Sequence, residues 1–172
     1  RFAKLTLTTR RFPGLVATGV ALLALSACSS SSLPTLTGFA AVRDQAARTE
    51  SAASDRATQL AEVATDCASC SAALRAVAAA SDERLEELGG LWDPWGGTPP
   101  EGASAPAAVS EAPTDVSAFV AWLARTATRD LEIAADTNRT SADEARTLSA
   151  AALGRYASAV TIAQAYGIDL DA

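Results

Sequence analysis

Alanine is the residue that most constrains the fold of this chain. It supplies 42 of the 172 residues, whereas Phe, Trp and Tyr together make up 5%. Alanine has the highest helix propensity, and its small side chain lets helices approach closely while it buries little apolar area. Strand-forming residues are sparse and scattered along the sequence. We therefore expect an all-α protein built from thin, closely packed helices.

Four segments carry apolar residues at helical spacing, and they run over residues 38–64, 67–88, 114–136 and 141–166. The last segment opens with Ser141 and Glu144 in the pattern of a capping box and ends at Gly167. Asp66 is expected to cap the second segment, and Gly89-Gly90 to end it. The apolar stripes contain Ala, Leu, Val and aromatic residues, so charged side chains are expected on solvated faces. Three aromatic residues within the helices are expected at core or core-edge positions, namely Trp122, Tyr156 and Tyr166.

The lengths of the connections predict the type of bundle. The first and second segments, and the third and fourth, are joined by loops short enough to make them antiparallel neighbours. Residues 89–113 between the two pairs contain five prolines, which argue against a helix there. Two antiparallel hairpins joined by one long crossover form the ferritin-like arrangement. We expect residues 38–172 to form one such four-helix domain, with its crossover at residues 89–113.

The helical part of the chain resembles a ferritin-like domain of unknown function found in actinobacterial lipoproteins and other exported proteins. The resemblance rests on the two Ala- and Arg-rich helical hairpins, on the Gly-Gly-Thr-Pro-Pro turn at Gly96–Pro100 and on the proline-rich crossover. It covers most of residues 38–166. It implies a ferritin-like bundle and no defined activity.

Composition excludes several kinds of site. The chain contains no histidine, so histidine-based catalytic triads and the Glu-x-x-His motifs of di-iron bundles are excluded. The net charge of −6 argues against a nucleic-acid partner. A metal site could use carboxylates alone, and the predicted helices carry eight candidates, namely Glu50, Glu62, Asp82, Glu83, Glu86, Glu87, Glu132 and Glu144. Because runs of charge on helices are usually solvated faces, we expect no bound metal or other cofactor.

The first 27 residues have the pattern of a secretory signal. Four basic residues precede an apolar stretch, 14–27, that is too short to span a bilayer as a permanent helix. The stretch ends in Leu25-Ser26-Ala27-Cys28, which resembles the lipobox of bacterial lipoproteins. The resemblance implies that Cys28 is lipidated and becomes the first residue of a chain anchored at the extracytoplasmic face of the cell membrane.

Beyond the signal, residues 28–37 are expected to be a polar tether. Its nine residues after the cysteine can reach about 30 Å when extended. The chain from Cys28 onward has 10 arginines and 20 acidic residues, a net charge of −10. Such a charge is repelled by anionic headgroups, so the acyl chains would hold the protein to the membrane.

Cys67 and Cys70 form a Cys-x-x-Cys motif at a predicted helix start. In an oxidising compartment the two thiols are expected to pair. A thiol–disulfide enzyme is the alternative, because a helix start can lower the pKa of a thiol. That alternative lacks the βαβ context typical of such enzymes, so a structural bond is favoured.

Two tryptophans, Trp92 and Trp95, lie in the crossover. Exposed tryptophans on loops commonly anchor partners, whereas folded-back indoles would instead cover the end of the bundle.

From these patterns we expect a membrane-anchored lipoprotein with a non-catalytic helical domain that acts as a binding or scaffold module. Its partner is an unknown protein or small molecule. A redox protein using Cys67 and Cys70, or a carboxylate metal binder, is the alternative.

Overall fold

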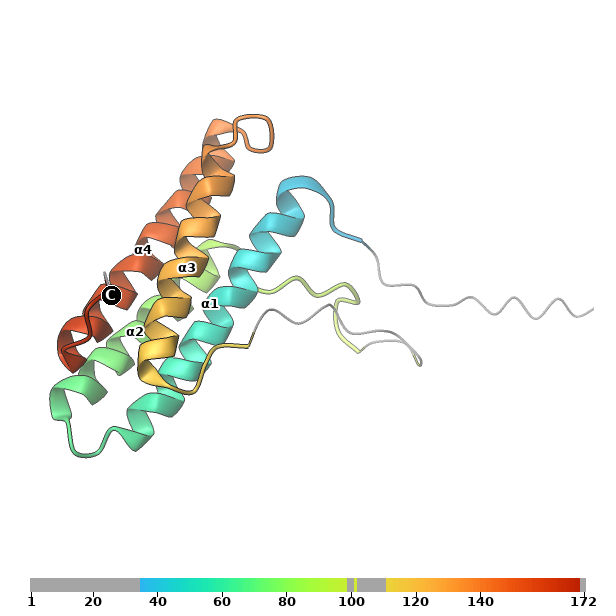
Figure 1. Ribbon diagram of the computed structural model, residues 1–172. Coiled ribbons are helices and arrows are strands. Elements are labelled where there is room, and N and C mark those ends of the chain that lie inside the picture. Colours follow the sequence, from blue (N-terminus) through green and yellow to red (C-terminus); the bar gives the residue numbers. More distant parts are fainter. Residues whose placement is uncertain (1–34, 99–100, 102–110, 171–172) are drawn as a thin grey trace, which may run out of the picture. The chain divides into compact units, whose positions relative to one another are not determined.

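The computed structural model describes residues 35–98, 101 and 111–170. These contain four helices, α1 (Gly38–Val63), α2 (Ala68–Glu87), α3 (Val116–Ala135) and α4 (Ala142–Tyr166), and no strand (Figure 1). The all-α prediction is confirmed, and each predicted helix boundary lies within two residues of the observed one. The lipobox at residues 25–28 and most of the tether lie outside the described residues.

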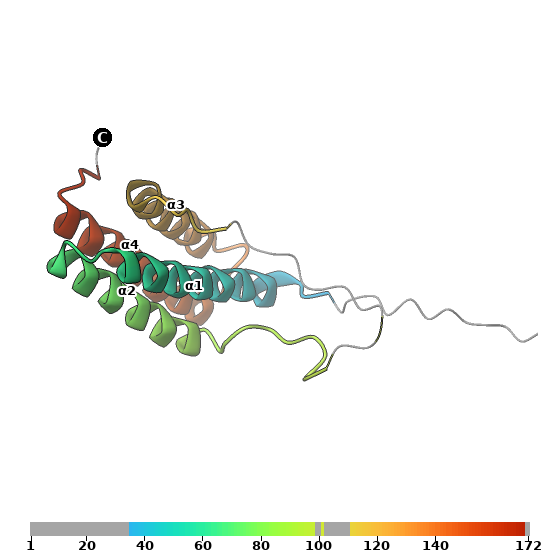
Figure 2. The same ribbon diagram turned by 90° about the horizontal axis from the view of Figure 1, so that it is seen from below.

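The helices form two antiparallel hairpins, α1 with α2 and α3 with α4. Figure 1 shows α1 and α4 running in one direction and α2 and α3 in the other. The chain therefore returns along the length of the bundle between α2 and α3, as the ferritin-like arrangement requires. α2 also packs against α4, and Figure 2 shows α2 and α3 on opposite sides of the α1–α4 pair.

Local signals fix the helix ends. Ser141 and Glu144 form the expected capping box, and Gly167 ends α4 with a left-handed φ of 65°. Gly89 and Gly90 follow α2 with positive φ, as expected. The predicted cap of α2 is wrong: the N-cap is Cys67, whose sulfur accepts a hydrogen bond from the Cys70 amide, and Asp66 lies one residue outside.

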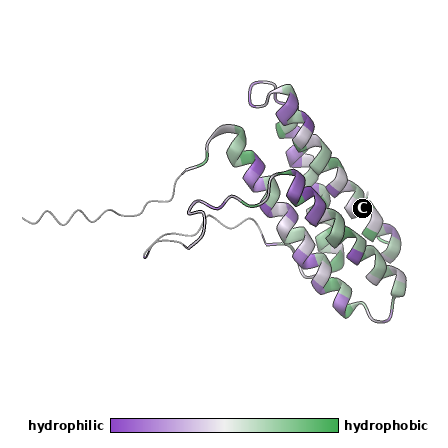
Figure 3. Ribbon diagram, turned by 180° about the vertical axis from the view of Figure 1, so that it is seen from behind, coloured by the Kyte–Doolittle hydropathy of each residue, from purple (hydrophilic) through white to green (hydrophobic). Residues whose placement is uncertain are grey.

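Small side chains form much of the core, as the alanine content predicts. Phe119 and Trp122 stack with ring centroids 6.0 Å apart and supply the aromatic bulk at one end of the bundle. Trp122 is buried as predicted and Tyr166 is half-buried at the core edge. Tyr156 is instead 41% exposed, because the side chain that points inward at this level of α4 is that of Arg155. Figure 3 shows hydrophobic and hydrophilic residues alternating along the helices.

Among the described residues, no helix is both long and apolar enough to cross a membrane.

Candidate functional site

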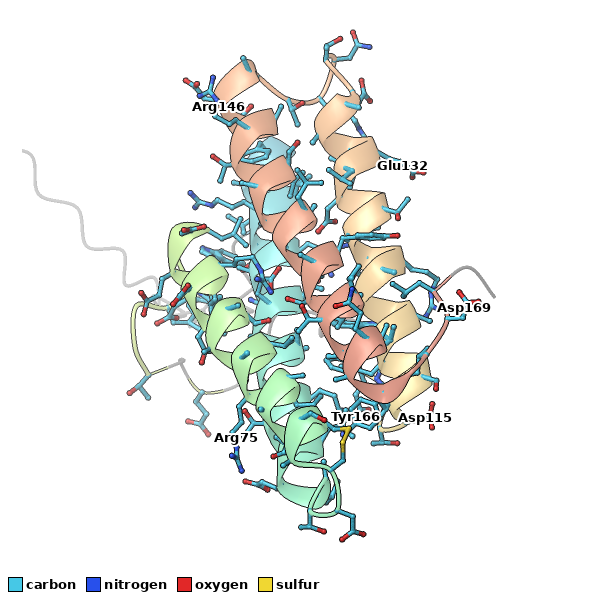
Figure 4. The ribbon with its side chains drawn as sticks, turned by 90° about the vertical axis from the view of Figure 1, so that its left-hand side faces the viewer. Arg75, Asp115, Glu132, Arg146, Tyr166 and Asp169 are labelled. Atoms are coloured by element: carbon cyan, nitrogen blue, oxygen red, sulfur yellow. A yellow bond between two sulfur atoms is a disulfide. The ribbon has the colours of Figure 1, made fainter. Side chains whose placement is uncertain are left out.

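A cluster of charged side chains lies inside the bundle, with one member from each helix. Glu50 of α1 and Arg155 of α4 are 0% exposed, Asp130 of α3 is 1% exposed, and Arg84 of α2 is 8% exposed. We call these four residues the buried charge network. Other charged side chains, such as those of Arg75, Glu132 and Arg146, point outward from the helices (Figure 4).

Glu50 is the centre of the buried charge network. Its Oε1 accepts a hydrogen bond from Arg155 Nε at 2.9 Å, and its Oε2 accepts one from Arg84 Nε at 3.0 Å. Arg155 Nη1 continues the chain of contacts by donating to Asp130 Oδ2 at 2.8 Å. Side chains from all four helices are therefore joined by charge-assisted hydrogen bonds, which are about twice as strong as neutral ones.

Polar neighbours satisfy the outer members of the network. Arg84 Nη2 donates to the hydroxyls of Ser81 and Ser158, at 2.9 and 3.2 Å. The second oxygen of Asp130 accepts from the Nη2 of Arg129, 2.8 Å away, on the exposed side. Burying a charge is tolerable only when it is paired and hydrogen-bonded, and here each carboxylate oxygen has an arginine partner.

Gly154 of α4 makes room for the Arg84 side chain. A Cβ at this position would lie 2.8 Å from Arg84 Cδ, closer than side chains tolerate. Glycine inside a helix costs about 1 kcal/mol relative to alanine, so its use here reflects the passage of the arginine between α2 and α4.

The expectation that charges lie on solvated faces is wrong for the buried charge network. On α1 the apolar stripe steps by seven residues from Ala46 to Ala53, and Glu50 stands in that gap on the same face. On α2, Arg84 is buried although the acidic residues beside it are exposed, as predicted. The sequence signal for this network is a charged residue at a core-facing position of every helix. Two of these residues are acidic and two are basic, so they can pair inside the bundle.

A carboxylate metal site is the other alternative that the sequence allows. Glu50 has both oxygens committed to arginines, and the remaining acidic candidates on the helices are exposed or spread over separate surfaces. Within the described ranges, no group of three or more metal-ligating side chains is assembled. The carboxylates at the centre of the bundle therefore accept hydrogen bonds from guanidinium groups.

Cys67 and Cys70 are joined by a disulfide at the start of α2. Cys70 is buried, with its sulfur 3.5 Å from the carbonyl oxygen of Ala165 near the end of α4, and Cys67 is half-buried. The bond is visible beside Tyr166 in Figure 4. Desolvation by partial burial raises the pKa of the Tyr166 phenol above its ordinary value. The disulfide thus lies where the turn between α1 and α2 meets the end of α4.

The two crossover tryptophans are half-buried. The Trp92 amide donates to Asp44 Oδ1 at 3.0 Å, and its carbonyl accepts from Arg48 Nη2 at 3.4 Å. Asp44 and Arg48 are themselves paired at 2.8 Å on α1. The Trp95 amide donates to Asp93 Oδ1 at 2.9 Å, which forms a tight turn. Neither indole is sealed in the core, and neither is fully exposed.

α1 holds both described ends of the crossover. Arg56 Nε donates to the carbonyl of Ala112 at 2.9 Å, while Arg48, eight residues earlier on α1, bonds Trp92. Between these two arginines lies a cavity of about 480 Å³, which includes Leu91, exposed to 47%, and Ala112 in its lining. The volume falls within the range of small-molecule sites.

No family model, curated protein or solved structure matches the chain.

Substituting Arg155 with Met tests the buried charge network. Removing one partner of a buried ion pair is expected to cost about 3–5 kcal/mol in the free energy of unfolding, measured by urea denaturation. Adding Asp130→Leu to Arg155→Met should recover part of that loss, because Glu50 and Arg84 then remain as a neutral pair.

The control is Arg125→Met at an exposed position of α3, which should change stability by no more than about 0.5 kcal/mol. An Arg155→Met protein as stable as this control would contradict the network's role.

Reduction of the Cys67–Cys70 bond separates the structural and redox interpretations. Because the bond closes a loop of only four residues, chain entropy predicts a loss of about 2 kcal/mol in stability, with the helices retained by circular dichroism. A structural bond should have a reduction potential below about −300 mV. A potential between about −120 and −270 mV would instead favour a thiol–disulfide enzyme.

Proposed function

We propose that this protein is a lipid-anchored lipoprotein of the extracytoplasmic membrane face, whose helical domain binds a protein partner without catalysing a reaction. The proposed location rests on the lipobox-like Leu25–Cys28 and on the basic and apolar residues before it. Cys28 would carry the lipid, and residues 29–37 would separate the helical domain from the bilayer.

The observation that carries the binding proposal is the attachment of Trp92 to α1. Its backbone is held by Asp44 and Arg48, so the start of the crossover is positioned by a helix. Leu91 on one side is 47% exposed, and Trp95 on the other is half-buried in the turn begun by Asp93. We call Leu91, Trp92 and Trp95 the crossover patch.

The crossover patch has the chemistry of a protein-binding surface. Large apolar and aromatic side chains that are partly exposed, surrounded by polar groups, are the usual anchors of interfaces. Arg48 and Asp55 line the cavity beside it and supply such a polar surround. Because the bundle beneath is held by the buried charge network, the patch would lose little freedom on binding, which favours affinity.

Lipidation of Cys28 is tested by metabolic labelling with an alkyne analogue of palmitate in a bacterium that processes lipoproteins. We expect label in the full chain and in a Cys67→Ser/Cys70→Ser variant, and none in Cys28→Ala. An unlabelled wild-type chain, or label that survives Cys28→Ala, would refute the anchor.

Partner binding is tested by placing a photo-crosslinking amino acid at position 95 in living cells. A discrete protein adduct is expected there and should disappear when Trp92→Ala is added. The same amino acid at position 132, exposed on α3, serves as the control and should give no such adduct. Identical adducts from both positions, or none from position 95, would contradict the proposal.

A further inference from the structure

A second groove lies between α2 and α4, away from the crossover patch. It has a volume of about 350 Å³ and is lined mainly by small side chains, including those of Ala76, Ala80 and Ala157. Among the described residues that line it, Arg84 alone carries a charge. The groove is therefore an apolar cleft with a single guanidinium group within it.

Arg84 has hydrogen-bonding capacity left over at this groove. Its Nε and Nη2 are used by Glu50, Ser81 and Ser158, whereas its Nη1 donates to no described residue. Within the described part of the chain, the fully enclosed side-chain N and O atoms without a partner belong to Trp122 and Arg155. Arg84 Nη1 is not among them, so it is not fully enclosed, and it lies beside Gly154, which lines the same groove.

The hydroxyls in the groove are already committed. Ser158 donates to the carbonyl of Gly154 at 3.1 Å, and Thr161 donates to that of Ala157 at 2.9 Å, both within α4. They leave Arg84 Nη1 as the donor available to a ligand, next to a surface of methyl groups. This pairing fits a molecule with one acceptor head and a short aliphatic tail.

The guanidinium group of Arg84 favours an anionic head group. Glu50 bonds its Nε, whereas its Nη1 remains a charged donor beside the groove. A single nitrogen offers a place for one carboxylate and lacks the several donors that a phosphate monoester would require. Hydrogen bonds from guanidinium to carboxylate are among the strongest available in proteins.

We propose that the α2–α4 groove is a binding site for a small aliphatic monocarboxylate, whose carboxylate accepts hydrogen bonds from Arg84 Nη1 and whose tail lies on Ala76, Ala80 and Ala157. The site is separate from the crossover patch and does not depend on it.

The test is a titration of the chain from Cys28 onward with sodium butyrate at constant ionic strength, followed by the NMR signals of Arg84 Nε–H and the Gly154 amide. A six-atom ligand is expected to saturate these shifts with a Kd of about 1 mM. Butyramide, which has the same shape and no charge, should bind at least about tenfold more weakly, because it lacks the charge-assisted bond.

Two variants locate the site. Ala157→Phe places a phenyl ring in the groove from an exposed position on α4, and should weaken butyrate binding at least about tenfold. Ala150→Phe, also exposed on α4 but outside the groove, should bind like wild type. The proposal is overturned by the absence of saturable shifts, by equal binding of butyramide, or by unchanged binding in Ala157→Phe.

Discussion

The ion pair between Glu50 and Arg155 is the interaction on which the rest of the bundle depends. Both side chains are wholly buried, so each charge requires a partner at its place in the interior. Arg84 and Asp130 extend the pair to the two remaining helices. Several neighbouring residues then follow from this requirement: Gly154 gives passage to Arg84, and Ser81 and Ser158 satisfy its outer edge.

The position of this network also bears on function. Di-iron bundles direct carboxylates and histidines inward to hold metal ions, whereas here two guanidinium groups supply the positive charge beside the inward carboxylates. The interior of the bundle is thereby committed to holding four helices together. The two proposed binding surfaces, the crossover patch and the α2–α4 groove, differ in character: one is aromatic, and the other combines methyl groups with the guanidinium group of Arg84.

The helices could be predicted from the sequence because their signals are local. Helical spacing, the capping box at Ser141 and the glycines after α2 and α4 each act within a few residues. The buried charge network could not be recognised in the same way, since Glu50 and Arg155 are 105 positions apart and each alone resembles a surface charge. For the same reason the sequence did not indicate that Arg155, and not Tyr156, lies on the inner face of α4. The attachment of Trp92 to Asp44 likewise depends on the path of the crossover.

The central claim is that the Arg155 guanidinium is locked inside the bundle by Glu50 and Asp130, and hydrogen exchange at Arg155 Nε–H measured by NMR tests it most directly. We expect this proton to exchange only through global unfolding, with the same free energy as the slowest backbone amides of α1 and α4. Exchange at the rate of a solvent-exposed arginine such as Arg125 would show that the network is open to water and would contradict the account.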